Sequence, residues 1–350
     1  MPVGSLEHGC AGSNLLKVLN IFIILCHNCL DEAQKPFRKS HHKSGRTCKM
    51  IDKKLHTEDV ESLLDVCLNK IENTDTDFGD KLSLNSVVNS YRDLLSNHTV
   101  NRELLSNIEQ SIDSRYGRCL RSLYHQALIY QLYLDNYAQI DNQYLPEGVS
   151  NYLKEDFLRI VDYAKKENPK FLTFNDFQFF SYMQKLCFKC FPVGNHNVNI
   201  SGFSRSLVFR QTFYSKLTFI KTVLGMGGNY PLFELHYNPH RLRLFNPDGW
   251  NEVFSLSAQI LKVKKEVKGV FGATWFYDPA IERISPELYY IRKLIEKIGG
   301  EFFLVGSSED DKKNAFFASN ARKKSYEEGK YVPTSYMAII KRDSLLRYYM

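Results

Sequence analysis

The sequence predicts an α/β (α+β) protein in which an N-terminal helical lobe is followed by a mixed sheet covered by helices. Apolar residues recur at helical spacing from Thr57 to Lys166. Strand-like and helix-like runs then alternate from Pro231 to Tyr349, with glycine and proline between them. Hydrophobic residues make up 43% of the chain, which is enough for a sizeable core. These observations indicate a globular protein.

A chain of 350 residues can hold two domains of ordinary size. We expect a leader, a helical lobe, an aromatic-rich connecting segment and an α/β domain. Their expected ranges are 1–54, 55–167, 168–230 and 231–350. The leader is expected to be disordered or not native, with translation from Met50 as one explanation, and residues 1–49 are predicted to contribute nothing to the fold.

The net charge of +7 equals that of residues 35–54, which lie within the leader. Residues 35–54 carry eight basic residues and one acidic residue, and the rest of the chain has 38 of each sign. A nucleic-acid-binding domain usually carries its positive charge on the folded domain, so we do not expect a nucleic-acid partner. The apolar run Leu15–Leu25 is short for a membrane span, so membrane association is not expected unless it inserts.

Cysteine usage is typical of a reduced, cytoplasmic protein. Two pairs have CxxC spacing, Cys26 with Cys29 and Cys187 with Cys190, which could form a zinc site. The pairs are far apart in sequence, and the second lies in an aromatic helical pattern where free thiols behave as small hydrophobic groups. We therefore expect buried thiols and no metal.

Helical stripes account for the first lobe. Thr57 caps the first helix, which has Glu58 and Asp59 in its first turn. A proline and glycine at 146–148 precede the last helix of the lobe. The predicted helices lie near 57–71, 84–95, 104–112, 116–137 and 152–161.

An aromatic-rich helix is predicted from about Asp176 to Cys190, placed between the lobes, because its aromatic residues surround it. Residues 191–199 are predicted to be a loop and 225–228 a turn. The α/β domain then reads strand 231–237, helix from Asn246, strand 267–278, helix from Ser285 to Gly299, strand 301–307, helix from Ser308 to Gly329, and strand 334–342.

The loop after the second of these strands is the richest candidate for a binding site. It holds Trp275, Tyr277, Asp278 and Arg283 just before a helix start, whose free amides favour an anion. A purely structural Asp-Pro turn is the alternative interpretation. We therefore expect these four side chains to line a substrate or cofactor pocket.

His236 lies at the end of the first strand and is a candidate for proton transfer. His240 follows at a metal-like spacing, but Pro239 excludes the helical geometry that would place both imidazoles on one metal. We therefore expect His236 to act as a catalytic group and no metal to be bound.

The segment from Gly269 to Ile340 resembles the second half of the acyl-CoA N-acyltransferase fold of the N-acetyltransferase superfamily. The closing run Asn320–Tyr331 is similar to the last helix of that fold, where an asparagine, a tyrosine and a Gly-aromatic pair precede the final strands. The resemblance implies acyl-CoA as cofactor and Tyr326 as the acid that protonates the leaving thiolate. The whole second lobe also resembles bacterial proteins of no assigned function.

Two functions follow from the resemblance. One is an acyl-CoA-dependent N-acyltransferase that acts on an unidentified amine. The other is a non-catalytic α/β binding or interaction module, because the family's Arg/Gln-x-x-Gly-x-Gly/Ala loop does not occur between Trp275 and Leu288. The partner is accordingly a small-molecule substrate or a protein. If the chain is an enzyme, Asp278, Arg283, His236 and Tyr326 are predicted to surround one pocket.

Overall fold

The computed structural model describes residues 57–74, 102–166, 172–317 and 319–350. The predictions for the leader, for Leu15–Leu25, for the helix near 84–95 and for the boundary at Asn168 lie outside the described residues. In the described part no helix is long and apolar enough to cross a membrane.

The described chain forms a mixed α/β protein, as the sequence predicts. It divides into two compact units. The larger contains the described residues up to 202 together with 230–271 and 341–350, and the smaller contains 203–229 and 272–340.

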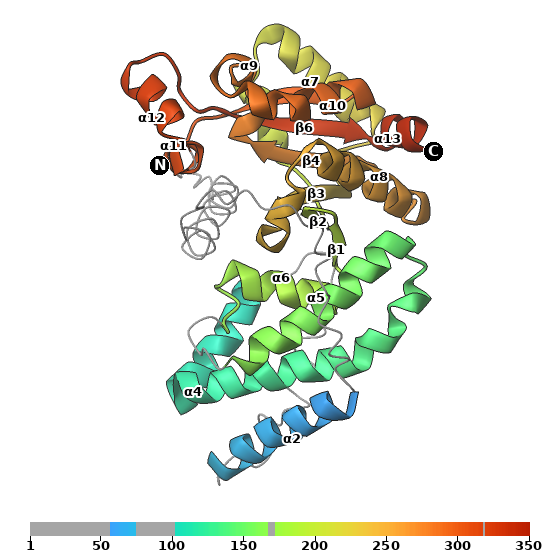
Figure 1. Ribbon diagram of the computed structural model, residues 1–350, viewed down its shortest axis with the longest axis vertical. Helices are drawn as coiled ribbons and strands as arrows, with labels where there is room; N and C mark the ends of the chain where they lie inside the picture. Colours follow the sequence, from blue (N-terminus) through green and yellow to red (C-terminus); the bar gives the residue numbers. More distant parts are fainter. Residues whose placement is uncertain (1–56, 75–101, 167–171, 318) are drawn as a thin grey trace, which may run out of the picture. The chain divides into compact units, whose positions relative to one another are not determined.

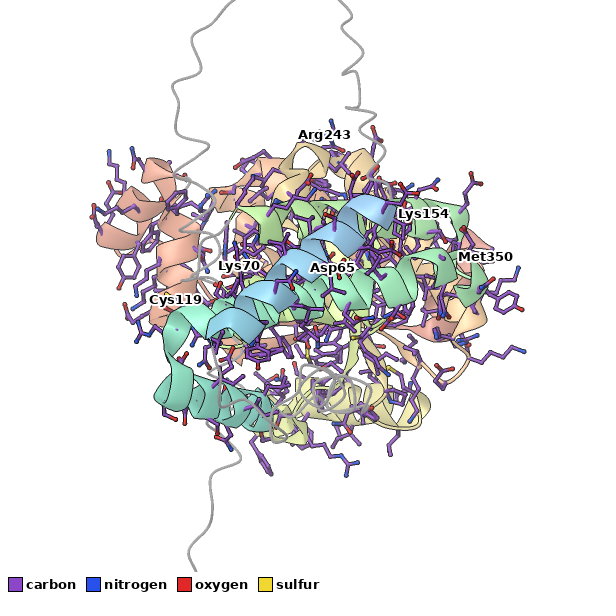
Figure 2. The ribbon with its side chains drawn as sticks, turned by 90° about the horizontal axis from the view of Figure 1, so that it is seen from below. Asp65, Lys70, Cys119, Lys154, Arg243 and Met350 are labelled. Atoms are coloured by element: carbon purple, nitrogen blue, oxygen red, sulfur yellow. The ribbon has the colours of Figure 1, made fainter. Side chains whose placement is uncertain are left out.

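The first four helices of the larger unit, α2, α4, α5 and α6, carry the predicted apolar stripes. Figure 1 shows α2 beside α4, and Figure 2 shows Asp65 and Lys70 on the side of α2 that faces away from α4. Gly117, at φ 79°, breaks α4 where the sequence predicts one helix to end and another to begin. Their bounds are α2 Thr57–Thr74, α4 Arg102–Asn136, α5 Glu147–Lys165 and α6 Phe177–Leu186.

The helical core is built from the apolar stripes of these four helices. Leu128 and Phe157 are fully buried in it, and Phe179 contributes from α6. His125 stacks on the Phe179 ring with centroids 4.9 Å apart. Phe179 and Tyr182 of α6 are thus core residues of the helical lobe.

The six strands are hydrogen-bonded in the order β1-β2-β3-β4-β6-β5. β1 pairs with β2, β2 with β3 and β5 with β6 in antiparallel fashion, whereas β3 and β4 are parallel. The sheet is therefore mixed, as predicted. The strand bounds are β1 Cys190–Val193, β2 His196–Ser201, β3 Leu232–Tyr237, β4 Gly269–Thr274, β5 Glu301–Gly306 and β6 Ser335–Lys341.

The predicted loop at 191–199 is wrong, because these residues form the β1–β2 hairpin. Gly194 makes the tight turn at φ 61°, a conformation that glycine adopts without strain. Pro192 is tolerated since β1 is an edge strand, where a missing N–H removes no ladder bond. The predicted helix from Asp176 also ends before this hairpin, at Leu186.

The remaining helices follow the predicted order, except that one predicted helix is divided in two and that α9 lies within the predicted loop after β4. The helix predicted from Ser308 to Gly329 is two helices, because the Ser319 hydroxyl accepts from the Arg322 N–H and caps a new start. α13 was not predicted. The bounds are α7 Phe213–Gly225, α8 Pro247–Val263, α9 Ile281–Ile284, α10 Tyr289–Ile298, α11 Glu309–Phe317, α12 Asn320–Glu327 and α13 Arg342–Tyr349.

Two predicted helix caps are confirmed. The Asn246 side chain accepts from the Gly249 N–H at 2.9 Å, and Pro247 occupies the first helical position of α8. At α11 the Ser308 hydroxyl accepts from the Asp311 N–H, while the Asp311 carboxylate accepts from the Ser308 N–H, each at 3.0 Å.

Candidate functional site

The strands β2 and β3 have one apolar and one polar face. On the apolar face His196 lies 4.4 Å from the Trp250 ring of α8, and Tyr237 contacts Phe245 at 5.6 Å. Phe233 and Leu235 share this face because side chains alternate along a strand. α8 therefore covers the apolar face, and the polar side chains of β3 lie on the opposite face.

The polar face carries His236 and Glu234, two residues apart on β3. Their cross-strand partners on β2 are Asn197 and Asn199, whose side chains point to the same side. His236 Nε2 lies 3.5 Å from Glu234 Oε2. The two side chains are 12% and 21% exposed, so solvent reaches both. The predicted candidate His236 thus lies beside a carboxylate that the sequence analysis did not single out.

The electrostatics of Glu234 favour its charged form. Burial by itself would raise the pKa of this carboxyl, but His236 and a hydrogen bond from Ser201 outweigh burial and lower it. A carboxylate held in its charged form beside an imidazole stabilises the imidazolium that forms when histidine takes a proton. The pair has the chemistry of a general base and its supporting acid group.

α5 and α6 cover the β1 end of this polar face. Cys190 lies opposite Asn199 in the ladder, and its thiol is within electrostatic range of Lys185 and Asp156. Burial raises the pKa of Cys190 to about 11, so the thiol is protonated near neutral pH. Cys190 is a free cysteine, and no cluster of three or more metal-ligating side chains occurs among the described residues.

Asp156 of α5 is the centre of a buried charge cluster that the sequence analysis missed. It accepts from Lys185 of α6, from Arg241 at 2.8 Å and from Arg159 at 2.7 Å. Burial alone would raise the pKa of Asp156, but these three cations lower it to about 2. No local pattern marks the cluster, because Arg241 lies 85 residues from Asp156.

His240 borders the same cluster. Its Nε2 atom lies 3.2 Å from the Tyr182 hydroxyl and 3.4 Å from Gln178 Nε2. Burial and the neighbouring cations Arg159 and Lys185 lower its pKa to about 4. The imidazole is therefore neutral near pH 7, and it serves as a polar contact between η4 (Pro239–Leu244) and α6.

In the smaller unit, the start of α10 gathers positive groups. Arg322 is buried, its guanidinium lies 4.8 Å from the Trp275 ring, and Nη1 donates to the Ser285 hydroxyl at 2.9 Å. Its carboxylate neighbour Glu287 is 3.9 Å away and mostly exposed. No side chain caps α10. The weakly neutralised guanidinium suits an anion.

Asp278, Tyr277 and Arg283 have different surroundings within this loop. Asp278 is buried and accepts from the Ala280 N–H at 2.8 Å, and burial raises its pKa. Tyr277 packs in the core against Phe302 with centroids 5.7 Å apart. Arg283 is exposed and donates to the Lys330 carbonyl oxygen at 3.5 Å. Asp278 therefore holds the Asp-Pro turn, and Trp275 and Arg283 are the loop residues open to a ligand.

Tyr331 is a buried group that the sequence analysis did not select. Its hydroxyl is enclosed and has no hydrogen-bond partner among the described residues. Burial, followed by the nearby Asp278 carboxylate, raises its pKa. An enclosed phenol beside a carboxyl and Arg322 adds a proton donor to this end of the smaller unit.

Tyr326 lies on α12, half-buried, with its ring 5.1 Å from the Phe316 ring and 5.4 Å from Lys312 Nζ. Its described neighbours thus belong to α11, whereas those of Asp278 include Ala280 and Tyr331. His236 belongs to the larger unit and the other three predicted residues to the smaller. A pocket shared by Asp278, Arg283, His236 and Tyr326 stays a prediction.

The first turns of α8 and α10 differ in how well they suit the coenzyme phosphates. At α8, Pro247 has no N–H, Asn246 occupies the Gly249 N–H, and Asp248 adds negative charge. α10 continues the 3-10 turn Pro286–Leu288, which also begins with a proline and carries the acidic Glu287, and the Arg322 guanidinium lies against Ser285. The Arg322 guanidinium is therefore the feature that favours the α10 end for a phosphate group.

No family model matches the chain, and no curated protein matches it by sequence. Among solved structures it is similar to an acyltransferase in complex with decanoyl-CoA and teicoplanin, at 11% identity and a TM-score of 0.44. It is also similar to an acyltransferase in complex with decanoyl-CoA, at 12% identity and a TM-score of 0.41. Each match covers 93% of this chain and 98% of the other. At these values the similarity carries no argument about the activity of this chain.

Proposed function

We propose that the protein is an acyl-CoA-dependent N-acyltransferase acting on a small-molecule amine. The observation that carries the proposal is the Glu234–His236 pair, at 3.5 Å, on the partly exposed polar face of β3. An amine nucleophile must lose a proton during acyl transfer, and an imidazole supported by a carboxylate is suited to accept it. The resemblance of residues 269–340 to the acyl-CoA N-acyltransferase fold names the donor.

The reaction can be written with named groups. Acyl-CoA supplies a thioester whose carbonyl carbon is the electrophile. The amine nitrogen bonds to this carbon, the carbon–sulfur bond breaks, and the His236 imidazole takes the amine proton while Glu234 stabilises the imidazolium. The resemblance assigns protonation of a departing thiolate to Tyr326, which belongs to the smaller unit. Within that unit, the guanidinium groups of Arg322 and Arg283 are suited to bind phosphate groups.

The start of α8 favours a second function, a non-catalytic binding or interaction module. This helix follows β3 after the short η4, and its first turn is closed by Asn246 and Pro247 and carries the acidic Asp248. A protein of this kind would retain the fold without binding the coenzyme. Coenzyme binding therefore separates the two functions.

Thermal unfolding of the full chain with increasing acyl-CoA tests the coenzyme. A ligand at about a hundred times its dissociation constant adds about 2.7 kcal/mol to stability, which raises the melting temperature by several degrees. The matched ligand is an acyl-pantetheine, which has the same thioester but no nucleotide phosphates and should produce a smaller shift. An unchanged melting temperature with every acyl-CoA tried would favour the interaction module.

The catalytic assignment is tested by His236→Gln, with His240→Gln as control. Thiol release from acyl-CoA in the presence of a panel of amines is the assay. His236→Gln should lower turnover about 10²–10⁴-fold, as loss of a general base does. His240→Gln should leave turnover within about threefold, because the neutral His240 imidazole contacts Tyr182 and Gln178. Equal losses in both variants would remove His236 from the mechanism.

A further inference from the structure

The outward face of α7 presents an apolar stripe to solvent. Phe213, Leu217, Ile220 and Leu224 are 44–73% exposed. Their spacing of four, three and four residues places them within an arc of about 60° on a helix that turns 100° per residue. The nearby Phe209 and Tyr214 are also exposed and extend the surface. We call these six residues the α7 stripe.

The opposite side of α7 is the one that packs inside the smaller unit. The Phe219 ring lies 5.7 Å from that of Phe203 and 5.0 Å from that of Phe303 of β5. The Thr222 hydroxyl donates to Glu301. Since this side already anchors the helix, the α7 stripe is not needed for the core. Large apolar groups gathered on an exposed face mark an interaction surface.

All charged residues of the segment that carries the α7 stripe are positive. Residues 203–229 contain Arg205, Arg210, Lys216 and Lys221 and no acidic residue. Lys216 and Lys221 lie on either side of the stripe on the helix, by the same spacing. The partner surface must therefore be apolar and negatively charged.

A second copy of the chain does not meet this requirement. Antiparallel packing of two α7 helices would place Phe213 against Leu224 of the partner subunit and Leu217 against Ile220 of the partner subunit. In this register Lys216 and Lys216 of the partner subunit lie on one flank of the contact, and Lys221 and Lys221 of the partner subunit lie on the other. Like charges on both flanks disfavour this dimer.

We propose that the α7 stripe binds the surface of a membrane that contains anionic lipids. Amphipathic helices that lie in the membrane interface have phenylalanine and leucine on one face and lysine beside it, as α7 has. Exposed aromatic residues, here Phe209, Phe213 and Tyr214, are suited to the headgroup level. The stripe is a ridge on a single helix, and a deformable lipid surface fits a ridge without a preformed groove. The inference is independent of the proposed acyl transfer.

Co-sedimentation of the full chain with phosphatidylcholine vesicles, with and without phosphatidylserine, tests the proposal. Binding is expected only when phosphatidylserine is present, and added salt should weaken it. Failure to bind the anionic vesicles would overturn the proposal.

Variants identify the surface that binds. Lys216→Gln with Lys221→Gln should weaken partitioning about 25-fold, which is about fivefold for each lysine. The matched control is Lys323→Gln with Lys324→Gln on α12, which removes the same charge from two other exposed lysines and should have less effect. Leu217→Ser with Leu224→Ser should abolish vesicle binding and leave the melting temperature unchanged. Vesicle binding that survives in the α7 variants would overturn the proposal, as would a dimer in light scattering that Leu217→Ser dissociates.

Discussion

The two polar clusters of the larger unit differ in how far solvent reaches them. Asp156 is fully buried and is surrounded by Lys185, Arg159 and Arg241. Glu234 and His236 also lie side by side, but on a strand face where both remain partly exposed. The three cations lower the pKa of Asp156, so this carboxylate stays charged at neutral pH, whereas a ligand can reach the partly exposed Glu234–His236 pair.

The difference separates stability from chemistry. The Asp156 cluster joins α5 and α6 to η4, so its role is to hold these elements together. The Glu234–His236 pair is partly exposed, so its removal leaves no enclosed ion. Substitutions in the first cluster should therefore unfold the protein, and those in the second should change its activity.

The largest effect is expected for Asp156→Ala. Removing the carboxylate leaves buried cations without their partner, which typically costs about 3–5 kcal/mol. Urea denaturation measures the loss in the free energy of unfolding. Asp141→Ala is the control, because its pair with Lys154 is exposed and such pairs contribute about 1 kcal/mol or less. Equal costs in the two variants would contradict a buried, structural cluster.

Acid should weaken the protein in two pH ranges. The pKa values of His196 and His240, about 3 and about 4, lie below the usual value, so the unfolded state binds more protons as pH falls from about 6.5. Each of the two histidines then lowers the free energy of unfolding by about 1.4 kcal/mol per pH unit. The pKa of Asp156, about 2, is also lowered, so its stabilisation is complete above about pH 4 and is lost between about pH 4 and 2.

Urea midpoints measured from neutral pH downward separate these contributions. Asp156→Asn should reduce the loss below about pH 4, where His196 still contributes down to about pH 3, and should keep the slope above pH 4. Wild-type stability that does not change between pH 6 and 4 would contradict the neutral, buried histidines.

Lys185→Met should cost less than Asp156→Ala. The carboxylate of Asp156 keeps Arg159 and Arg241 when the lysine is removed, and methionine fills a similar volume. The expected cost is about 1–3 kcal/mol, that of one charged hydrogen bond. A larger cost than that of Asp156→Ala would place the centre of the cluster on Lys185.

The smallest change in stability is expected for Glu234→Gln. The substitution keeps the shape of a partly exposed side chain, so the cost should be about 1 kcal/mol or less in the same urea measurement. Turnover in the acyl-transfer assay should nevertheless fall about tenfold or more, because the imidazolium loses its carboxylate. A loss of several kcal/mol with unchanged turnover would reverse the comparison between the two clusters.

Local signals in the sequence were sufficient for many single elements. The Asn246–Pro247 start of α8 and the Ser308–Asp311 box of α11 are made by residues within three positions of one another, so the pattern carries the hydrogen bonds that form. The strands β3, β4, β5 and β6 were predicted from apolar runs bounded by glycine and proline. His236 was selected as a candidate from its place at a strand end.

Contacts between distant residues were decided by the tertiary structure alone. Asp156 lies in an amphipathic helix, where a charged residue predicts an exposed position, and it is buried because Lys185 and Arg241 arrive from other elements. The β1–β2 hairpin was predicted to be a loop, because its polar residues and Pro192 are unfavourable in a strand. It forms a hairpin because β2 also pairs with β3. Alternation along β3 already placed Glu234 and His236 on one face. The pairing with β2 and the packing of α8 on the opposite face leave the face with Glu234 and His236 polar and partly exposed. The sequence pattern could not show this, because burial depends on neighbours that are far away in the chain.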